Sequence, residues 1–119
     1  MTQLQRAPGP YSGGFRQIPV PPFNPAIRIS QAATWHEGRL YVGGGRAPLG
    51  NRHSGEDSHP ELGAEIQCYD PDAGTWERVY SSPLDEEGIA RDRSVRAFTV
   101  FKGEGDPNPV LYVAVGSLQ

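Results

Sequence analysis

Several classes of protein are excluded by what this sequence has little of. Its 119 residues include one cysteine, Cys68, so neither an internal disulfide framework nor a multi-cysteine metal site is possible. No apolar run approaches the roughly 18 residues of a membrane-spanning helix, and the first residues, MTQLQRAPGPYSGG, lack the apolar core of a secretory signal. The net charge is −3 and no basic stripe is present, which argues against nucleic-acid binding. The default expectation is a cytoplasmic protein with no membrane or nucleic-acid partner.

Helical periodicity is also lacking, and the apolar residues gather instead in short runs bounded by turn residues. Such clustered runs are rare in disordered chains, although 15 glycines and 12 prolines are present. The sequence predicts an all-β fold with no helix longer than about two turns. Seven strands are expected: Phe15–Ile18, Ser30–Trp35, Leu40–Gly43, Ala64–Tyr69, Thr75–Tyr80, Val95–Phe101 and Val110–Val115.

The order of these strands repeats along the chain. Three pairs of segments match at offsets of about 61 to 71 residues: GGFRQI with GTWERV, AATW with AFTV, and LYVGGG with LYVAVGS. One repeat holds four short strands, which we call strands A to D in chain order. Four-stranded antiparallel units in tandem are typical of the blades of a β-propeller, in which each blade is covered by its neighbours. We therefore expect Leu40–Gly43 to pair with both Ser30–Trp35 and Ala64–Tyr69, in two blade-like sheets.

The central repeat resembles the kelch repeat. In that family an apolar strand ends in a glycine pair, a Tyr-Asp-Pro turn follows, and a tryptophan lies seven residues after the tyrosine. The residues that carry the resemblance are Arg28, Tyr41, Gly43, Gly44, Tyr69, Asp70 and Trp76. The resemblance implies a kelch-like β-propeller fragment with four-stranded antiparallel blades and an incomplete ring. Further blades or self-association are then needed to complete the fold, because propellers have about 4–8 blades.

These motif residues have a structural interpretation. Glycines at a strand end permit a positive φ angle and a close approach of the backbone. Tyr69 and Trp76 are expected to form a cross-strand aromatic pair. Asp70 is expected to hold a tight turn that Gly74 closes in the left-handed conformation. We assign these residues to the support of the blade rather than to chemistry.

The repeat divides the chain into four parts. Residues 1–13 form an extended Pro/Gly-rich lead-in, and 14–27 hold the last strand of a preceding or closing blade with its connection. Residues 28–83 form one complete blade, and 84–119 hold a connection and the first two strands of the next. Because the sequence ends after a strand B, we expect it to be part of a longer propeller, with closure by several copies as the alternative.

One loop carries groups that could ligate a metal. Asn51–Glu61 contains two imidazoles and three carboxylates, from His53, Glu56, Asp57, His59 and Glu61. No ligand from a strand anchors this spacing, so a solvated polar loop is favoured and neither a metal nor a cofactor is assigned. Cys68 lies in the middle of a strand and is expected to be a small buried hydrophobe.

Two long connections are expected on one rim of the blade. Antiparallel strands place the B–C connection, Arg46–Gly63, beside the D–A connection, Ser81–Arg93, while the short turns lie on the opposite rim. Long loops on a rigid scaffold are common binding sites. The candidate binding residues are Arg46, Arg52, His53, Asp57, His59, Glu61, Asp85, Glu86 and Arg91.

The favoured function is a non-catalytic binding or scaffold module that uses these long loops to bind a partner protein. Two alternatives remain open. The chain is the N-terminal part of a propeller enzyme similar to the galactose oxidases, although no catalytic residue can be assigned in it. Otherwise it is a structural subunit that closes a ring by oligomerisation.

Overall fold

The computed structural model describes residues 17–24, 27, 29–45 and 60–116. Within these residues the chain forms an antiparallel sheet of six strands and no helix, which confirms the all-β expectation. It follows that no described helix is long and apolar enough to cross a membrane. The strands are β1 (Ile29–His36), β2 (Arg39–Gly45), β3 (Glu65–Asp70), β4 (Thr75–Ser81), β5 (Ser94–Phe101) and β6 (Val110–Gly116).

The first four strands form a meander. β2 pairs with β1 on one side and with β3 on the other, and β3 pairs with β4. This arrangement confirms that Leu40–Gly43 lies between the two strands expected to flank it. The β1–β2 turn has Glu37 at φ 51° and Gly38 at φ 78°, a pair of positive angles that matches the right-handed twist of a hairpin.

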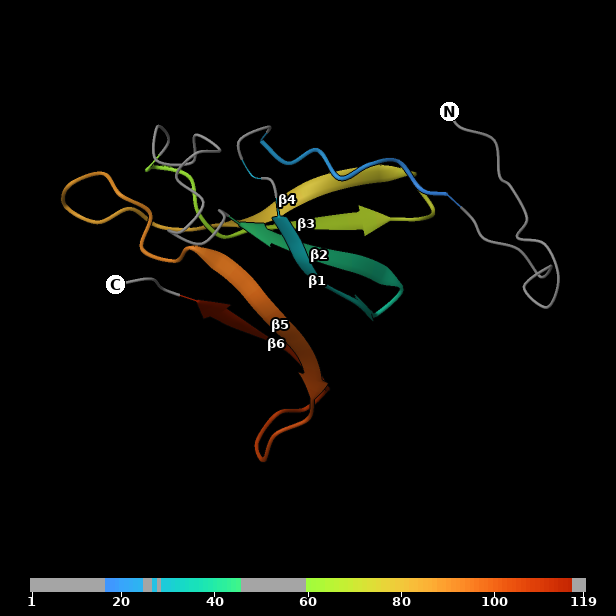
Figure 1. Ribbon diagram of the computed structural model, residues 1–119. Helices are drawn as coiled ribbons and strands as arrows, with labels where there is room; N and C mark the ends of the chain where they lie inside the picture. The colour runs from blue at the N-terminus through green and yellow to red at the C-terminus, as the bar shows by residue number, and fades with distance from the viewer. Residues whose placement is uncertain (1–16, 25–26, 28, 46–59, 117–119) are drawn as a thin grey trace, which may run out of the picture.

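The last two strands form a hairpin that is tied to the meander at one point. β5 pairs with β6, and the single register pair between Gly45 and Ser94 joins β5 to β2. From this tie the β5–β6 hairpin diverges from β1–β4 (Figure 1). The expectation of two separate sheets is therefore corrected to one six-stranded sheet with a single link between its two parts. The link forms because the backbones of β2 and β5 meet closely at Gly45.

The meander has two sides, distinguished by the alternation of side chains along its strands. The hairpin side carries Ala32, Tyr41, Ile66 and Tyr80, which pack with Val95 and Phe98 of β5. The opposite side, which we call the lead-in side because residues 17–24 lie on it, carries Val42, Glu65, Gln67, Trp76 and Arg78, as the strand register requires. A small cluster of buried residues, Ala64, Ile66 and Val95, lies on the hairpin side.

The glycines at the end of β2 permit this packing. A Cβ atom built on Gly43 would collide with the side chain of Val95, and one built on Gly45 would collide with Ser94. The expected close approach is thus confirmed at both positions. Neither glycine uses the positive φ that this residue type permits, because neither has a φ angle in the left-handed region. What these positions need is the absence of a side chain, not the freedom of the backbone.

The sequence repeat between β1–β2 and β5–β6 is also a structural repeat. Ala32 pairs with Gly43 and Thr34 with Tyr41 in the first hairpin. In the second hairpin Ala97 pairs with Ala114 and Thr99 with Tyr112, the same positions of the repeat. The register also shifts at the equivalent place, between Ser30 and Ala32 and between Val95 and Ala97. Both hairpins thus share one register and one irregularity.

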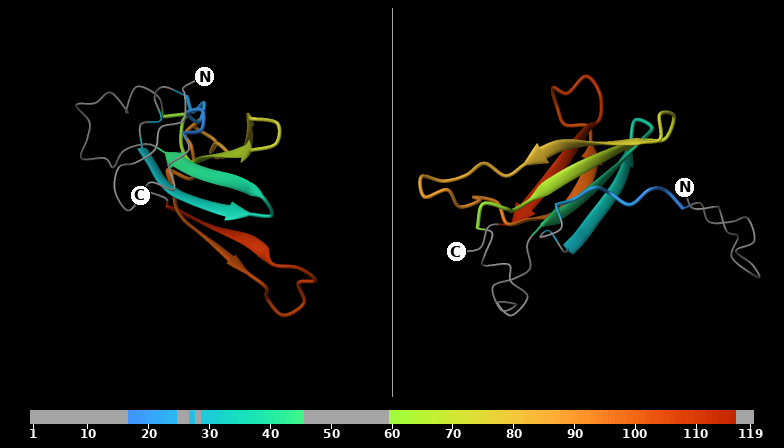
Figure 2. Two further views of the ribbon diagram at one scale, coloured as in Figure 1. Left: turned by 90° about the vertical axis from the view of Figure 1, so that its right-hand side faces the viewer. Right: turned by 90° about the horizontal axis from the view of Figure 1, so that it is seen from above.

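The segment before β1 differs from its expected structure. Gln17 and Ile18 are coil, so the described end of the expected Phe15–Ile18 strand is not a strand; Phe15 and Arg16 lie outside the described residues. The reason is the proline content of this stretch, since proline has no N–H to donate to a neighbouring strand. The segment, residues 17–24, lies on the side of the meander away from the β5–β6 hairpin (Figure 2). On this side Trp76 Nε1 of β4 donates a hydrogen bond of 3.0 Å to the Pro19 carbonyl oxygen.

Candidate functional site

The described ends of the two long connections lie together at one rim. The Ala90 N–H donates to the Pro60 carbonyl oxygen at 2.8 Å, and the Ala64 N–H donates to the Asp92 carbonyl oxygen at the same distance. These two backbone bonds bracket residues 60–64 of the first connection and 90–92 of the second. Side chains on the two segments therefore share one surface.

The second connection is shaped by its own hydrogen bonds. The Asp85 carboxylate oxygen Oδ1 accepts from the N–H groups of Glu87 at 2.8 Å and Ile89 at 3.0 Å. Leu84 forms an isolated antiparallel bridge with Ala90, and Gly88 has a φ angle of 80°. Asp85 thus organises the turn, since a carboxylate that accepts from the backbone two and four residues ahead holds a local loop closed.

A polar network fixes the base of this connection. The Tyr80 hydroxyl donates to Asp92 Oδ2 at 2.5 Å, and the Asp92 N–H donates to Ser82 Oγ at 2.8 Å. Burial of the phenol, together with its hydrogen bond to the Asp92 carboxylate, raises the pKa of Tyr80 to about 12. The phenol therefore stays neutral at physiological pH and keeps the proton that it donates to Asp92.

The structure describes four of the nine candidate binding residues. Glu61, Asp85, Glu86 and Arg91 are all exposed at the rim formed by the two connections. The other five, Arg46, Arg52, His53, Asp57 and His59, lie outside the described residues.

The metal-binding alternative for Asn51–Glu61 falls almost entirely on residues 46–59, which the structure does not describe. Among the residues that it does describe, no group of three or more His, Cys, Asp or Glu side chains is placed to hold a metal ion. Cys68 is a free thiol with 3% exposure, as expected for a small buried hydrophobe. It contacts Tyr41 across the β2–β3 pair, and burial raises the pKa of the Tyr41 phenol, with the thiol contributing.

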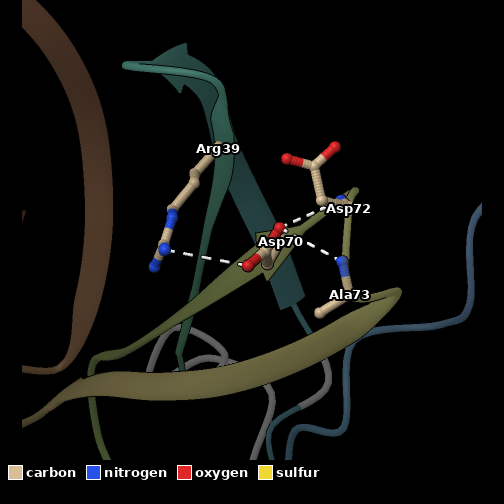
Figure 3. A network of polar contacts seen from close by, with 4 residues as sticks. All are labelled: Arg39, Asp70, Asp72 and Ala73. Atoms are coloured by element: carbon tan, nitrogen blue, oxygen red, sulfur yellow. Dashed lines mark hydrogen bonds and ion pairs between the residues drawn. The ribbon is translucent and has the colours of Figure 1, made fainter.

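The motif residues hold the β3–β4 hairpin, as predicted. Tyr69 and Trp76 face each other across the strands, with ring centroids 5.0 Å apart. Asp70 Oδ1 accepts from the N–H of Asp72 at 2.9 Å and of Ala73 at 3.3 Å (Figure 3). Gly74 closes the turn at φ 70°. Arg28, the remaining polar residue of the motif, lies outside the described residues.

Arg39 adds an ion pair to this turn. Its guanidinium Nη2 lies 3.7 Å from Asp70 Oδ2, on the side of the carboxylate away from the turn N–H groups (Figure 3). The Arg39 side chain is half exposed, so water and salt screen the pair and it contributes little to stability.

A polar pocket opens on the lead-in side of the sheet, and sequence reasoning did not find it. Its volume is about 370 Å³, and it is lined by Pro22, Asn24, Glu65, Gln67, Trp76 and Arg78. Glu65 and Gln67 are 4% and 3% exposed, which is unusual for a carboxylate and a carboxamide in a small sheet. Gln67 Nε2 donates to Glu65 Oε2 at 2.6 Å, so the two side chains lie together in the pocket.

The sequence contains a signal for this pocket. In AEIQCYD the polar side chains of Glu65 and Gln67 occupy alternate positions of an otherwise apolar strand, so they must share one side of the sheet. The signal was hidden because a strand covered on both faces is expected to lose its clean alternation. The wall formed by Pro22 and Asn24 could not be anticipated, since it depends on where the lead-in segment folds back.

Comparison with known proteins yields no relative. No protein-family model, curated protein or solved structure matches this chain.

Proposed function

We propose that the chain is a segment of a kelch-like β-propeller and acts as a non-catalytic binding or scaffold module. The observation that carries the proposal is the shared register and shared irregularity of the β1–β2 and β5–β6 hairpins. A repeat in both sequence and pairing is characteristic of architectures built from stacked copies of one unit. The first unit is the complete meander β1–β4, and the second unit begins with β5 and β6.

The way in which the two units touch supports a ring. Phe98 packs against the hairpin side of the meander, and its equivalent in the first unit is Ala33. Ala33 lies on the lead-in side, because strand neighbours alternate and Ala32 lies on the hairpin side. The contact thus joins unlike faces of successive units. Such a head-to-tail contact can be repeated from unit to unit, and it closes into a ring when the rotation between units allows.

The rim supports the binding part of the proposal. Both long connections end there, and the exposed side chains on them carry charges of both signs, with Glu61, Glu86 and Arg91 among them. Loops held on a rigid sheet bind partners at low entropic cost, because the scaffold fixes their ends. A mixed-charge surface of this kind suits a polar protein partner better than an apolar ligand.

The test replaces the B–C connection, Arg46–Gly63, with a short Gly-Ser turn. Partner capture from cell extract, repeated with the purified partner, is expected to be lost while the β circular-dichroism signal stays unchanged. The matched control shortens the turn at residues 102–109, on the opposite rim, and should keep capture. Undiminished capture by the first variant, or equal loss in both, would contradict the proposal.

A further inference from the structure

The pocket on the lead-in side holds a carboxylate in an environment that calls for a positive charge. Glu65 is 4% exposed, and its partner within the described residues is the neutral carboxamide of Gln67. An ionised carboxylate removed from water is costly unless it is paired with a cation or accepts several hydrogen bonds. Within the described part of the chain, the group that meets this requirement is one neutral donor at 2.6 Å.

Arg78, a cationic residue on the pocket wall, does not neutralise the Glu65 carboxylate. Arg78 is the register partner of Gln67 and lines the pocket, yet its side chain is exposed, and no ion pair within 4.0 Å joins it to Glu65. The buried carboxylate and the exposed guanidinium therefore leave room between them for a group from outside.

The remaining walls suit a flat cationic group on an aliphatic stem. Trp76 presents an indole whose N–H is already used by the Pro19 carbonyl oxygen, which fixes the ring in place. An indole face attracts guanidinium groups, and the ring of Pro22 on the pocket wall offers an apolar surface for a stem. The carbonyl oxygen of the Gln67 side chain is a second acceptor, because its amide nitrogen donates to Glu65.

We propose that this pocket binds an arginine side chain of a partner polypeptide. Glu65 accepts from the guanidinium, the Gln67 carboxamide oxygen accepts a further N–H, and the stem lies along Trp76. Arginine fits better than lysine because its planar group offers several donors in a fixed geometry and stacks on aromatic rings. The site lies on β3 and β4 and is independent of the long-loop rim, so it goes beyond the function proposed above.

The two charged residues of the pocket have opposite predicted effects. Removal of the charge in Glu65→Gln is expected to weaken binding of an arginine peptide at least tenfold, because the counter-charge is lost. Removal of the charge in Arg78→Gln is expected to leave binding equal or stronger, because Arg78 repels the incoming guanidinium. A ligand with an anionic group would give the reverse order of these two effects.

The experiment titrates the chain with acetyl-Gly-Arg-Gly-amide and follows the NMR signals of the Gln67 side-chain amide and the Trp76 indole N–H. The matched ligand control is acetyl-Gly-citrulline-Gly-amide, which has nearly the same shape without the charge and is expected to bind at least tenfold more weakly. The matched protein control is Glu77→Gln, which removes an exposed carboxylate from β4 on the hairpin side and should not change binding.

Three results would overturn the assignment. They are the absence of saturable shifts with the arginine peptide, equal affinity for the arginine and citrulline peptides, and a loss of binding in Arg78→Gln. Circular dichroism of each variant confirms that the sheet is intact, and Glu65→Gln is isosteric, so a loss of binding in it reports the charge rather than the fold.

Discussion

Tyr80 links the sheet to the second long connection through one short hydrogen bond. Its hydroxyl donates to Asp92 Oδ2 at 2.5 Å. The Asp92 N–H donates to Ser82 Oγ, and the Asp92 carbonyl oxygen accepts from the Ala64 N–H. Hydrogen bonds to charged groups contribute about 1.5–3 kcal/mol, more than neutral ones. Because Tyr80 is only partly buried, we expect Tyr80→Phe to lower the free energy of unfolding by about 1–2 kcal/mol in urea titrations at pH 7.

Tyr80→Phe should also remove a pH dependence of the free energy of unfolding. The pKa of Tyr80 is raised from 10.0 to about 12 in the folded chain, so its contribution to stability is complete below pH 10 and is lost as pH rises from 10 to 12. The difference in stability between the wild type and Tyr80→Phe is therefore expected to shrink over this window. A difference that stays constant from pH 9 to pH 12 would show that the bond to Asp92 does not control ionisation.

Gly43 determines how closely β5 can approach the meander. A Cβ atom added there meets the side chain of Val95, a residue with 0% exposure. Overpacking of this kind costs about 1–3 kcal/mol. We expect Gly43→Ala to lower the unfolding free energy by that amount in chemical denaturation.

A second substitution provides the control for this prediction. Val95→Ala alone should also destabilise, because it leaves a cavity in the core. The double variant Gly43→Ala, Val95→Ala should be more stable than the sum of the two single effects predicts, since the added methyl fills part of the space removed. Additive effects in the double-mutant cycle would mean that Gly43 is needed for another reason.

At the scale of elements, the β3–β4 turn depends on a single side chain. Asp70 accepts two backbone N–H groups, and its loss leaves both without a side-chain partner (Figure 3). We expect Asp70→Ala to lower the unfolding free energy by about 1 kcal/mol, as for the loss of a capping residue. Arg39→Gln, which removes only the exposed ion pair at 3.7 Å, should change it by less than about 0.5 kcal/mol. Similar losses in both variants would assign the stability to charge and not to the turn.

Most strands could be predicted because local chemistry decides them. The β3–β4 hairpin was found from Tyr69, the DPDAG turn and Trp76, whose roles depend on neighbours close in sequence. The expected Phe15–Ile18 strand is absent at its described end, Gln17 and Ile18, because the prolines that follow cannot donate to a neighbouring strand. Strand pairing inside the meander followed from chain order, whereas the link between Gly45 and Ser94 depends on a long-range approach that no local signal reports.

The candidate sites also include parts that the sequence predicts and parts that it does not. The meeting of the two long connections follows from antiparallel chain order, and the bond from Ala90 to Pro60 lies where that order requires. The role of Asp85 as a turn-organising residue was missed, because composition alone does not distinguish a carboxylate that accepts backbone N–H groups from one that faces solvent. The pocket beside Glu65 was missed because one of its walls comes from residues about forty positions away.

At the scale of the whole molecule, several large apolar side chains of the second hairpin are exposed. On the outward side of the second hairpin, Phe101 is 59% exposed, Tyr112 44% and Val110 38%, and the rings of Phe101 and Tyr112 lie 6.2 Å apart. By the repeat, this side is equivalent to the hairpin side of the meander, which is covered by β5. It therefore lacks the neighbour that its equivalent has, and contiguous apolar surface of this kind favours association.

We therefore expect the isolated chain to associate, because a head-to-tail contact between units leaves the outward side of the second hairpin uncovered. Analytical ultracentrifugation should detect species larger than the 12.9 kDa monomer, with a fraction that rises with concentration. Phe101→Glu is expected to reduce that fraction, since it places a charge in the centre of the contact. Leu84→Glu adds the same charge at a residue that is 50% exposed on the second long connection, at the rim rather than on this face, and should leave association unchanged. A stable monomer at all concentrations with a cooperative thermal melt would contradict the stacking of units, and equal effects of the two substitutions would attribute association to net charge rather than to this face.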